Sequence, residues 1–497
     1  MKRKGLLILG ALLLAACGST GDSSSSLPSS EIDDGDLVFD TNGNIVFNDV
    51  ELEMWSVTTG VDANTQDEII AEFNEMYDGL INVNTMHISR YDMETLLNAT
   101  MEFDKENAPD LIFSHSHRAN EYDDRGWLMP IDQVAAKAEI VIDESDYVPS
   151  LLSAVKFKDH YYGLPQDVHS TFVQVRLDIL EENDLPIPTN YQELVNVSEQ
   201  AIELAAAGNL WIRGENSEGK GWNEWRKANR NETYYPFPIA FGDMWVHEFL
   251  GYTAAIQNGA AIIDDEGYPA WNSEEAAAGL QILRDWINPT STSVNQYQLS
   301  QSLGSAYDVG DAPFMSGNSI FKLNGPWNYP TELSMWEREL RNDGGDSNIL
   351  NMPLSRLFAL DPDAEYADYV KGEGHAFMLT TASGSRTRQV ASSIFADWMV
   401  NNAGIEWARR GHLPALKSVE NSSAYQDDPD FEKYIVNYGS SSDYVVVQPT
   451  PYFTYVDNHF KGVLQQTMAE SFFSTPITTI LNDEYEDCID YIDLYLG

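Results

Sequence analysis

Three side chains suited to ligand binding stand close together at positions 115, 117 and 118, in the segment FSHSHR. The guanidinium of Arg118 can donate a fork of parallel hydrogen bonds, and the imidazole of His117 can donate or accept one. His115 and His117 also carry the nitrogen atoms that zinc prefers, but a zinc site needs about three histidines and a carboxylate held close together. Histidines on exposed loops are common, so we predict a hydrogen-bonding site here and no metal site.

A second group of candidate contacts follows the first predicted strand, over residues 51–57. Trp55 is the aromatic residue of this strand, and the hydroxyls of Thr58 and Thr59 come directly after it. Open α/β sheets bind ligands outside the carboxyl ends of their strands, which makes the three side chains candidates for ligand contact. Packing in the core explains Trp55 equally well.

The elements that position these residues alternate between strands and helices. Apolar residues at helical spacing predict a helix over 66–77, and residues 110–113 (DLIF) form a short buried strand. Asn190 or Thr189 is the expected N-cap of the next helix, and residues 273–287 form another amphipathic helix. This alternation predicts an α/β protein with doubly wound sheets.

The composition limits the partners and the cross-links of the chain. Its 497 residues are enough for two or more domains with complete cores. It carries 78 acidic and 29 basic residues, a formal net charge of −49, and such a field repels nucleic acid and anionic headgroups. Only two cysteines are present, one of them in the N-terminal segment, so neither an intramolecular disulfide nor a cysteine metal site is expected.

Residues 2–17 predict export and lipid attachment. Three basic residues precede an apolar stretch over 6–14 that is too short to span a bilayer. The small residues before Cys17 (LAAC) closely resemble a bacterial lipobox. We therefore expect a signal peptide over 1–16 and a lipidated Cys17 that starts a flexible linker, residues 17–49. The predicted location is the outer side of the cell membrane, facing a periplasm or the cell surface.

Seven segments, in order along the chain, resemble the family 1 extracellular solute-binding proteins of ABC importers, the maltose-binding-protein-like group. Each motif is weak alone, and their shared order behind a lipobox makes the resemblance specific. The segments are 108–113 (APDLIF), 126–131 (GWLMPI), 161–165 (YYGLP), 259–272 (GAAIIDDEGYPAWN), 314–317 with 323–327 (FMSG and LNGPW), 374–377 (GHAF) and 411–415 (GHLPA).

The resemblance implies a periplasmic-binding-protein-like fold of type II, in which a hinge joins two α/β lobes and the ligand lies between them. Lobe one would comprise residues 50–167 and 353–445, and lobe two residues 168–352 and 446–497. It further implies a monomeric carrier that closes around a carbohydrate, docks on the permease subunits in the membrane, catalyses no reaction and needs no cofactor.

The resemblance also assigns aromatic side chains to the sugar. Sugar sites stack flat aromatic faces on the apolar face of a pyranose and place planar polar groups on its hydroxyls. Trp327, which follows Gly325 and Pro326, stands where the family stacks on sugar, although buried tryptophans are often core residues. The stretch 452–455 contributes an aromatic residue in the family, and Tyr455 is our candidate.

Four polar residues match positions of the family's pocket. Arg118 is retained from a sugar-binding Asp-Arg pair, and His117 replaces the aspartate. His169 stands in place of a pocket glutamate, and Asp167 stands where many members have an acidic ligand contact. The alternative for Asp167 and His169 is a hydrogen bond to the backbone at the hinge.

Two other functions remain open at this level. A lipid-anchored glycosidase that degrades polysaccharide would need two carboxylates about 5 Å or about 6.5–9.5 Å apart, and the chain has 78 acidic residues that could supply such a pair. No nucleophile-elbow, zinc-protease, P-loop or dinucleotide-binding motif is present. The acidic charge also fits a carrier of a cationic solute such as a polyamine.

Overall fold

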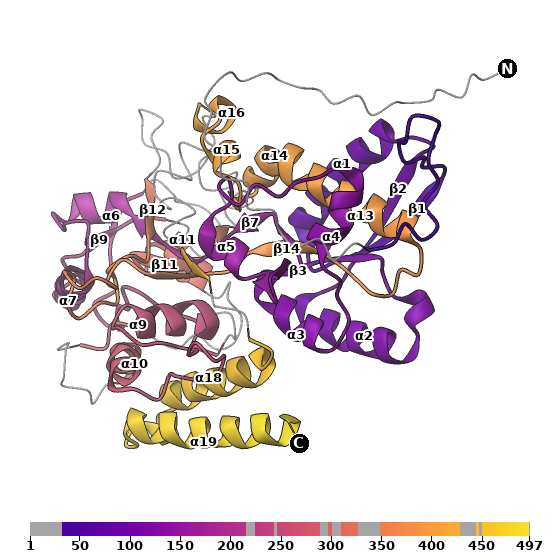
Figure 1. Ribbon diagram of the computed structural model, residues 1–497. Helices are drawn as coiled ribbons and strands as arrows, with labels where there is room; N and C mark the ends of the chain where they lie inside the picture. Colours follow the sequence, from indigo (N-terminus) through magenta and orange to yellow (C-terminus); the bar gives the residue numbers. More distant parts are fainter. Residues whose placement is uncertain are drawn as a thin grey trace.

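The computed structural model describes residues 32–214, 224–242, 246–288, 297–300, 310–326, 348–427, 444–446 and 450–496. Two α/β lobes lie side by side and are joined by segments that cross between them (Figure 1). The proposed lipidation site Cys17, the first part of the linker and Trp327 lie outside the described residues.

The first lobe is built on a mixed five-stranded sheet. Its strand order is β2-β1-β3-β14-β6, in which the first three strands are parallel and β14 runs antiparallel to both of its neighbours, β3 and β6. All five residues of β3 are buried, as expected for a central strand covered on both faces. The strands are β1 (Val50–Ser56), β2 (Ile81–His87), β3 (Leu111–His115), β14 (His375–Leu379) and β6 (Leu164–Pro165).

Helices cover both faces of this sheet, with α1 and α13 on one side and α2 and α3 on the other (Figure 1). In α1, the predicted apolar face buries Ile69, Ile70 and Phe73, but its fourth member, Met76, is exposed at the last residue of the helix. The helix begins at Gly60, before the predicted start at Gln66. The helices are α1 (Gly60–Met76), α2 (Arg90–Phe103), α3 (Ala119–Asp124) and α13 (Arg386–Asn402).

The second lobe contains an antiparallel sheet in which β8 (Phe172–Arg176) lies between β11 (Phe321–Asn324) and β12 (Ile349–Pro353). Two of its helices begin where the sequence predicted. Asn190 caps α7 (Tyr191–Ala206) by accepting a 3.0 Å hydrogen bond from the Glu193 amide, and Ser273 caps α10 (Glu274–Ile287) in the same way.

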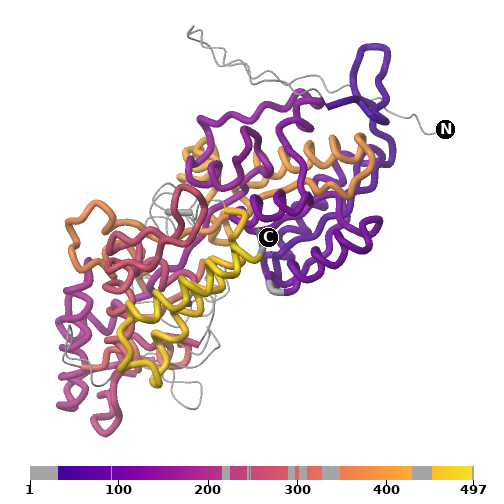
Figure 2. The backbone as a smooth tube through the Cα atoms, turned by 60° about the horizontal axis from the view of Figure 1, so that its bottom comes forward, coloured from indigo at the N-terminus to yellow at the C-terminus, as the bar shows by residue number. Residues whose placement is uncertain are grey.

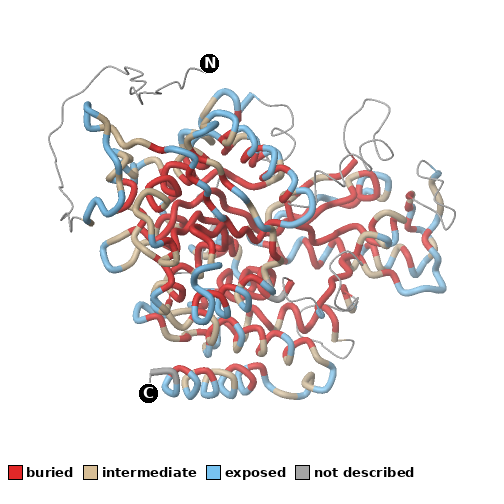
Figure 3. Tube along the Cα trace, turned by 90° about the vertical axis from the view of Figure 1, so that its right-hand side faces the viewer, coloured by how far each residue is buried: buried red, intermediate tan, exposed pale blue. Residues whose placement is uncertain are grey.

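The C-terminal helices α18 (Phe453–Met468) and α19 (Ile477–Leu496) pack side by side against this second lobe (Figure 2). Buried residues of α18, α19, α9 (Tyr252–Ile256) and α10 form one apolar cluster. Figure 3 shows α19 with a buried side toward the molecule and an exposed side away from it. Among the described helices, none joins enough length with enough apolar character to cross a membrane.

Two crossing segments meet at the hinge between the sheets. One leads from β6 through β7 (Asp167–Val168) to β8, and the other leads from β12 back to β14. They pair through a bridge between His169 and Glu373, and β7 also pairs with β15 (Leu413–Pro414). This arrangement places both crossing segments beside the carboxyl ends of the first-lobe strands. The predicted lobe boundaries remain predictions.

Candidate functional site

Five of the nine histidines of the chain gather where the crossing segments meet the first-lobe sheet. They come from four places in the fold: the end of β3, the first crossing segment, the start of β14 and the residue before β15. All five side chains are buried, unlike the loop histidines that the sequence suggested. They are His115, His117, His169, His375 and His412.

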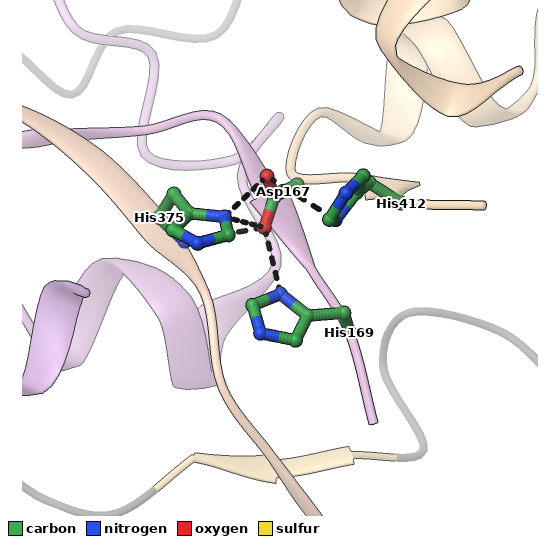
Figure 4. A group of neighbouring side chains, drawn as sticks. All are labelled: Asp167, His169, His375 and His412. Atoms are coloured by element: carbon green, nitrogen blue, oxygen red, sulfur yellow. Dashed lines mark hydrogen bonds and ion pairs between the residues drawn. The ribbon is translucent and has the colours of Figure 1, made fainter. Parts of the chain in front are cut away.

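Asp167 lies at the centre of three of these imidazoles, which surround its carboxylate from three chain segments (Figure 4). Its Oδ1 lies 3.2 Å from Nδ1 of His169 and 3.1 Å from Nδ1 of His375. Nδ1 of His412 lies 3.8 Å from Oδ2. Trp407, on α14 (Gly404–Ala408), donates a 2.5 Å hydrogen bond from its indole nitrogen to that same Oδ2.

Burial and neighbouring charges act in opposite directions on the pKa of Asp167. Burial alone would raise the pKa of Asp167, but the neighbouring His375 and His412 outweigh it and hold that pKa well below its usual value. Burial lowers the pKa of His169 to about 4. Asp167 is therefore an anion at neutral pH, and the imidazole of His169 is neutral.

A second cluster surrounds Glu373, which stands two positions before His375 of the first cluster. Nζ of Lys371 lies 2.8 Å from its Oε1, and Nη1 of Arg90 lies 3.7 Å from its Oε2. Nε2 of His115 and Nδ1 of His117 each lie 3.5 Å from this carboxylate. Glu373 is fully buried. Burial raises its pKa, but Lys371 and Arg90 outweigh that effect and hold the pKa well below its ordinary value.

Glu248 joins this cluster from the second lobe, on the helical segment η4 (His247–Gly251). It pairs with Arg90 at 3.1 Å, with Lys461 at 3.4 Å and with Lys371 at 3.5 Å. Burial raises the pKa of Glu248, but these three cations lower it to about 2. The site thus holds paired buried charges from both lobes.

A third group combines an aromatic face with planar polar side chains. The guanidinium of Arg118 lies 5.0 Å from the ring centroid of Phe453, at the start of α18, and the ring of His117 stacks on the same phenyl at 4.2 Å. Nη1 of Arg118 donates hydrogen bonds to Glu121 at 3.0 Å and to Thr454 at 2.7 Å. Residues of both lobes therefore meet at this aromatic face.

The sequence matches the model of one protein family, described as bacterial extracellular solute-binding protein, over residues 68–433. This chain belongs to that family. No curated protein sequence matches this solute-binding protein.

Several solved structures share the fold of this solute-binding protein. The GacH receptor of Streptomyces glaucescens, solved unliganded and with acarbose, is 13% identical with a TM-score of 0.66, covering 89% of this chain and 99% of that one. An ABC substrate-binding protein of Listeria monocytogenes in complex with cycloalternan is 15% identical with a TM-score of 0.64, covering 90% and 100%. UgpB of Mycobacterium tuberculosis, in complex with glycerophosphocholine, is 14% identical with a TM-score of 0.64, covering 90% and 99%.

The solute-binding protein brings four of the residues predicted from its sequence into this region, namely His117, Arg118, Asp167 and His169. Tyr455 lies elsewhere, packed with the apolar cluster of the second lobe and stacked on Tyr491 of α19.

The residues predicted after the first strand also lie apart from the aromatic face. Trp55 is buried in the core. Thr58 points inward, with its hydroxyl bonded to Gln66 at 2.9 Å and to His87 at 2.8 Å. Thr59 is exposed at the start of α1. Whether these side chains contact a ligand remains a prediction.

Sequence reasoning did not single out Glu248, Glu373, His375 or His412, and within the stretch 452–455 it chose Tyr455 rather than Phe453. Both histidines stand inside segments that carried the family resemblance, 374–377 and 411–415. Their place in those segments is the local signal that could have indicated them.

Proposed function

We propose that this chain is the substrate-binding lipoprotein of an ABC importer, which captures a carbohydrate between its lobes and delivers it to the membrane permease. An oligosaccharide is the favoured ligand. The observation that carries this proposal is the contact of Arg118, from the first lobe, with Phe453 and Thr454 of the second. An aromatic face beside a planar hydrogen-bond donor is what a sugar ring with its hydroxyls requires.

The arrangement also suits capture by closure. A ligand that touches Arg118 and Phe453 together contacts both lobes, so it binds the closed state better than the open one and shifts the protein toward closure. The ligands of the similar receptors support a carbohydrate, since acarbose and cycloalternan are both sugars. The glycerophosphocholine complex means that the fold alone does not select sugar.

The test is a titration of the full chain with a panel of mono- and oligosaccharides, read by tryptophan fluorescence and melting temperature. We expect at least one sugar to shift both readouts. Arg118→Ala and Trp327→Ala should each weaken binding about 30-fold, the loss expected when a side chain that carries much of the binding energy is truncated. Arg356→Ala is the matched control, because this arginine forms an exposed ion pair with Asp368 at 2.7 Å.

A panel without any response would contradict the carbohydrate proposal. Polyamines and glycerophosphodiesters would then be titrated in the same way. Release of reducing sugar from polysaccharide by the purified chain would instead favour the glycosidase, which we do not expect.

A further inference from the structure

Three imidazole Nδ1 atoms converge on one buried carboxylate at the hinge. We propose that Asp167, His169, His375 and His412 bind a first-row divalent cation of the zinc class. This metal site is additional to the proposed carbohydrate site and does not depend on it. The sequence predicted no metal site, because these ligands come from three separate places along the chain, at 167–169, 375 and 412, whereas in the fold their ligand atoms all lie within 4.8 Å of one another.

The donor set and its spacing suit this class of ion. Zinc takes four ligands in tetrahedral geometry, with bonds of about 2.0–2.1 Å, so neighbouring ligand atoms lie about 3.3 Å apart. Oδ1 of Asp167 lies 3.2 Å from Nδ1 of His169 and 3.1 Å from Nδ1 of His375. Three imidazoles and one carboxylate favour zinc, cobalt or nickel over calcium and magnesium, which prefer oxygen ligands.

The surrounding residues orient these ligands as metal sites require. Trp407 donates to Oδ2 of Asp167 and the His375 amide donates to Oδ1, so both oxygens are held in place and each keeps a second lone pair for the ion. Nε2 of His412 pairs with Asp62 at 3.2 Å, so its Nδ1 faces the centre. Nε2 of His169 lies 3.8 Å from Glu373. Carboxylates on the outer nitrogen of a histidine fix its tautomer and raise its basicity toward a metal.

A cluster held by hydrogen bonds alone leaves one group without a partner. The carboxylate of Asp167 offers about four acceptor positions, and it already accepts from Trp407, from the His375 amide and from the imidazoles of His169 and His375. Nδ1 of His412 is buried and makes no hydrogen bond among the described residues. A bound cation gives Nδ1 of His412 a partner, because the cation accepts a lone pair from each of the four side chains.

Two neighbouring groups of histidines and carboxylates share Glu373 and are poorer sites. Lys371 and Arg90 already pair with Glu373, and their charges oppose a second cation at the same carboxylate. Within the described part of the chain, the ion pairs of Asp167 are formed with histidines only. No lysine or arginine in that part of the chain is therefore paired with this carboxylate, where its charge would oppose a cation.

The test uses the full, untagged chain after treatment with EDTA. Titration with Zn²⁺ against a chromogenic chelator should give one tightly bound equivalent, and Co²⁺ should give the intense visible bands of a tetrahedral complex. His412→Gln should weaken Zn²⁺ binding at least about tenfold. His160→Gln is the matched control, because His160 is a partly buried histidine paired with a single carboxylate, Asp132, at 2.9 Å.

Circular dichroism of each variant establishes that it is folded before its affinity is compared. The proposal is overturned if the unaltered chain binds Co²⁺ without tetrahedral bands, or if folded His412→Gln binds Zn²⁺ as tightly as the unaltered chain. Either result would leave a purely hydrogen-bonded cluster. The sugar titration has separate readouts and separate variants, so the failure of one proposal is distinguishable from the failure of the other.

Discussion

Arg90 donates hydrogen bonds to both carboxylate oxygens of Glu248, at 3.2 and 3.1 Å, across 158 positions of sequence. Arg90 begins α2 in the first lobe, and Glu248 lies on η4, which packs against α9 and α18 of the second. The pair is a direct link between the lobes. The Glu248 side chain is 3% exposed and that of Arg90 is 27% exposed, so loss of the arginine would leave a buried carboxylate short of a partner, which costs more than breaking a surface ion pair.

Arg90→Gln should therefore favour the open form and lower the melting temperature. The change removes one cation from two buried carboxylates, Glu248 and Glu373, and leaves Lys371 and Lys461 to balance them. Small-angle X-ray scattering of the ligand-free chain should give a larger radius of gyration. Arg356→Gln, at an exposed ion pair, is the control. Equal scattering and melting for the two variants would refute the role of Arg90 in closure.

Gly374→Ala should disturb the contact between the crossing segments. A Cβ atom at this position would lie 2.4 Å from the carbonyl oxygen of Asp167 and 2.6 Å from Leu151, so one crossing segment must move. We expect a loss of about 1–3 kcal/mol in the free energy of unfolding, measured by urea denaturation. Gly384→Ala, where a Cβ meets nothing within 4 Å, should cost much less, and an equal loss at both positions would contradict the close approach.

Asp178→Asn should reduce stability in a pH-dependent way. Asp178 is buried and bonded to Arg176 at 2.8 and 2.9 Å and to Arg213 at 2.6 Å. Burial raises the pKa of Asp178, but the two arginines outweigh it and lower that pKa below its ordinary value. A carboxylate with a lowered pKa in the folded state stabilises the fold above its unfolded pKa, near 3.9, and loses that contribution as the pH falls further.

The variant should accordingly lose about 3–5 kcal/mol at pH 7, because the buried Arg176 loses its partner. The difference from the unaltered chain should shrink at about pH 3 and below, as Asp178 itself takes up a proton. Urea denaturation at pH 7 and at about pH 3 measures this difference in the free energy of unfolding. A difference that does not change with pH would show that the charge of Asp178 makes no contribution.

Cys17→Ser should release the protein from the membrane. The thiol of Cys17 is the proposed point of lipid attachment, and without it the exported chain has no acyl group to insert. Fractionation of cells and metabolic labelling with a fatty acid measure both effects. Cys488→Ala is the control, because this cysteine is buried in α19, and loss of labelling in that variant would point away from Cys17.

The sequence by itself determined the features that depend on neighbours along the chain. The apolar spacing of Ile69, Ile70 and Phe73 predicted the buried face of α1. A cap at Asn190 or Thr189 predicted the start of α7, and the amphipathic pattern over 273–287 predicted α10. A helix face repeats every three or four residues and a cap acts over three residues, so both can be recognised from a short stretch of sequence. The motifs read in order predicted the two-lobed fold.

Only the tertiary structure decided which residues meet at the site. Asp167 and His375 are 208 positions apart, and they meet because β14 inserts between β3 and β6 of the first-lobe sheet. The same packing turned Thr58 inward and carried Tyr455 toward α19. Strand order and register depend on the burial of whole faces, and no local pattern encodes them. The sequence therefore indicated which residue types could bind a ligand, while the fold determined which of these residues lie together.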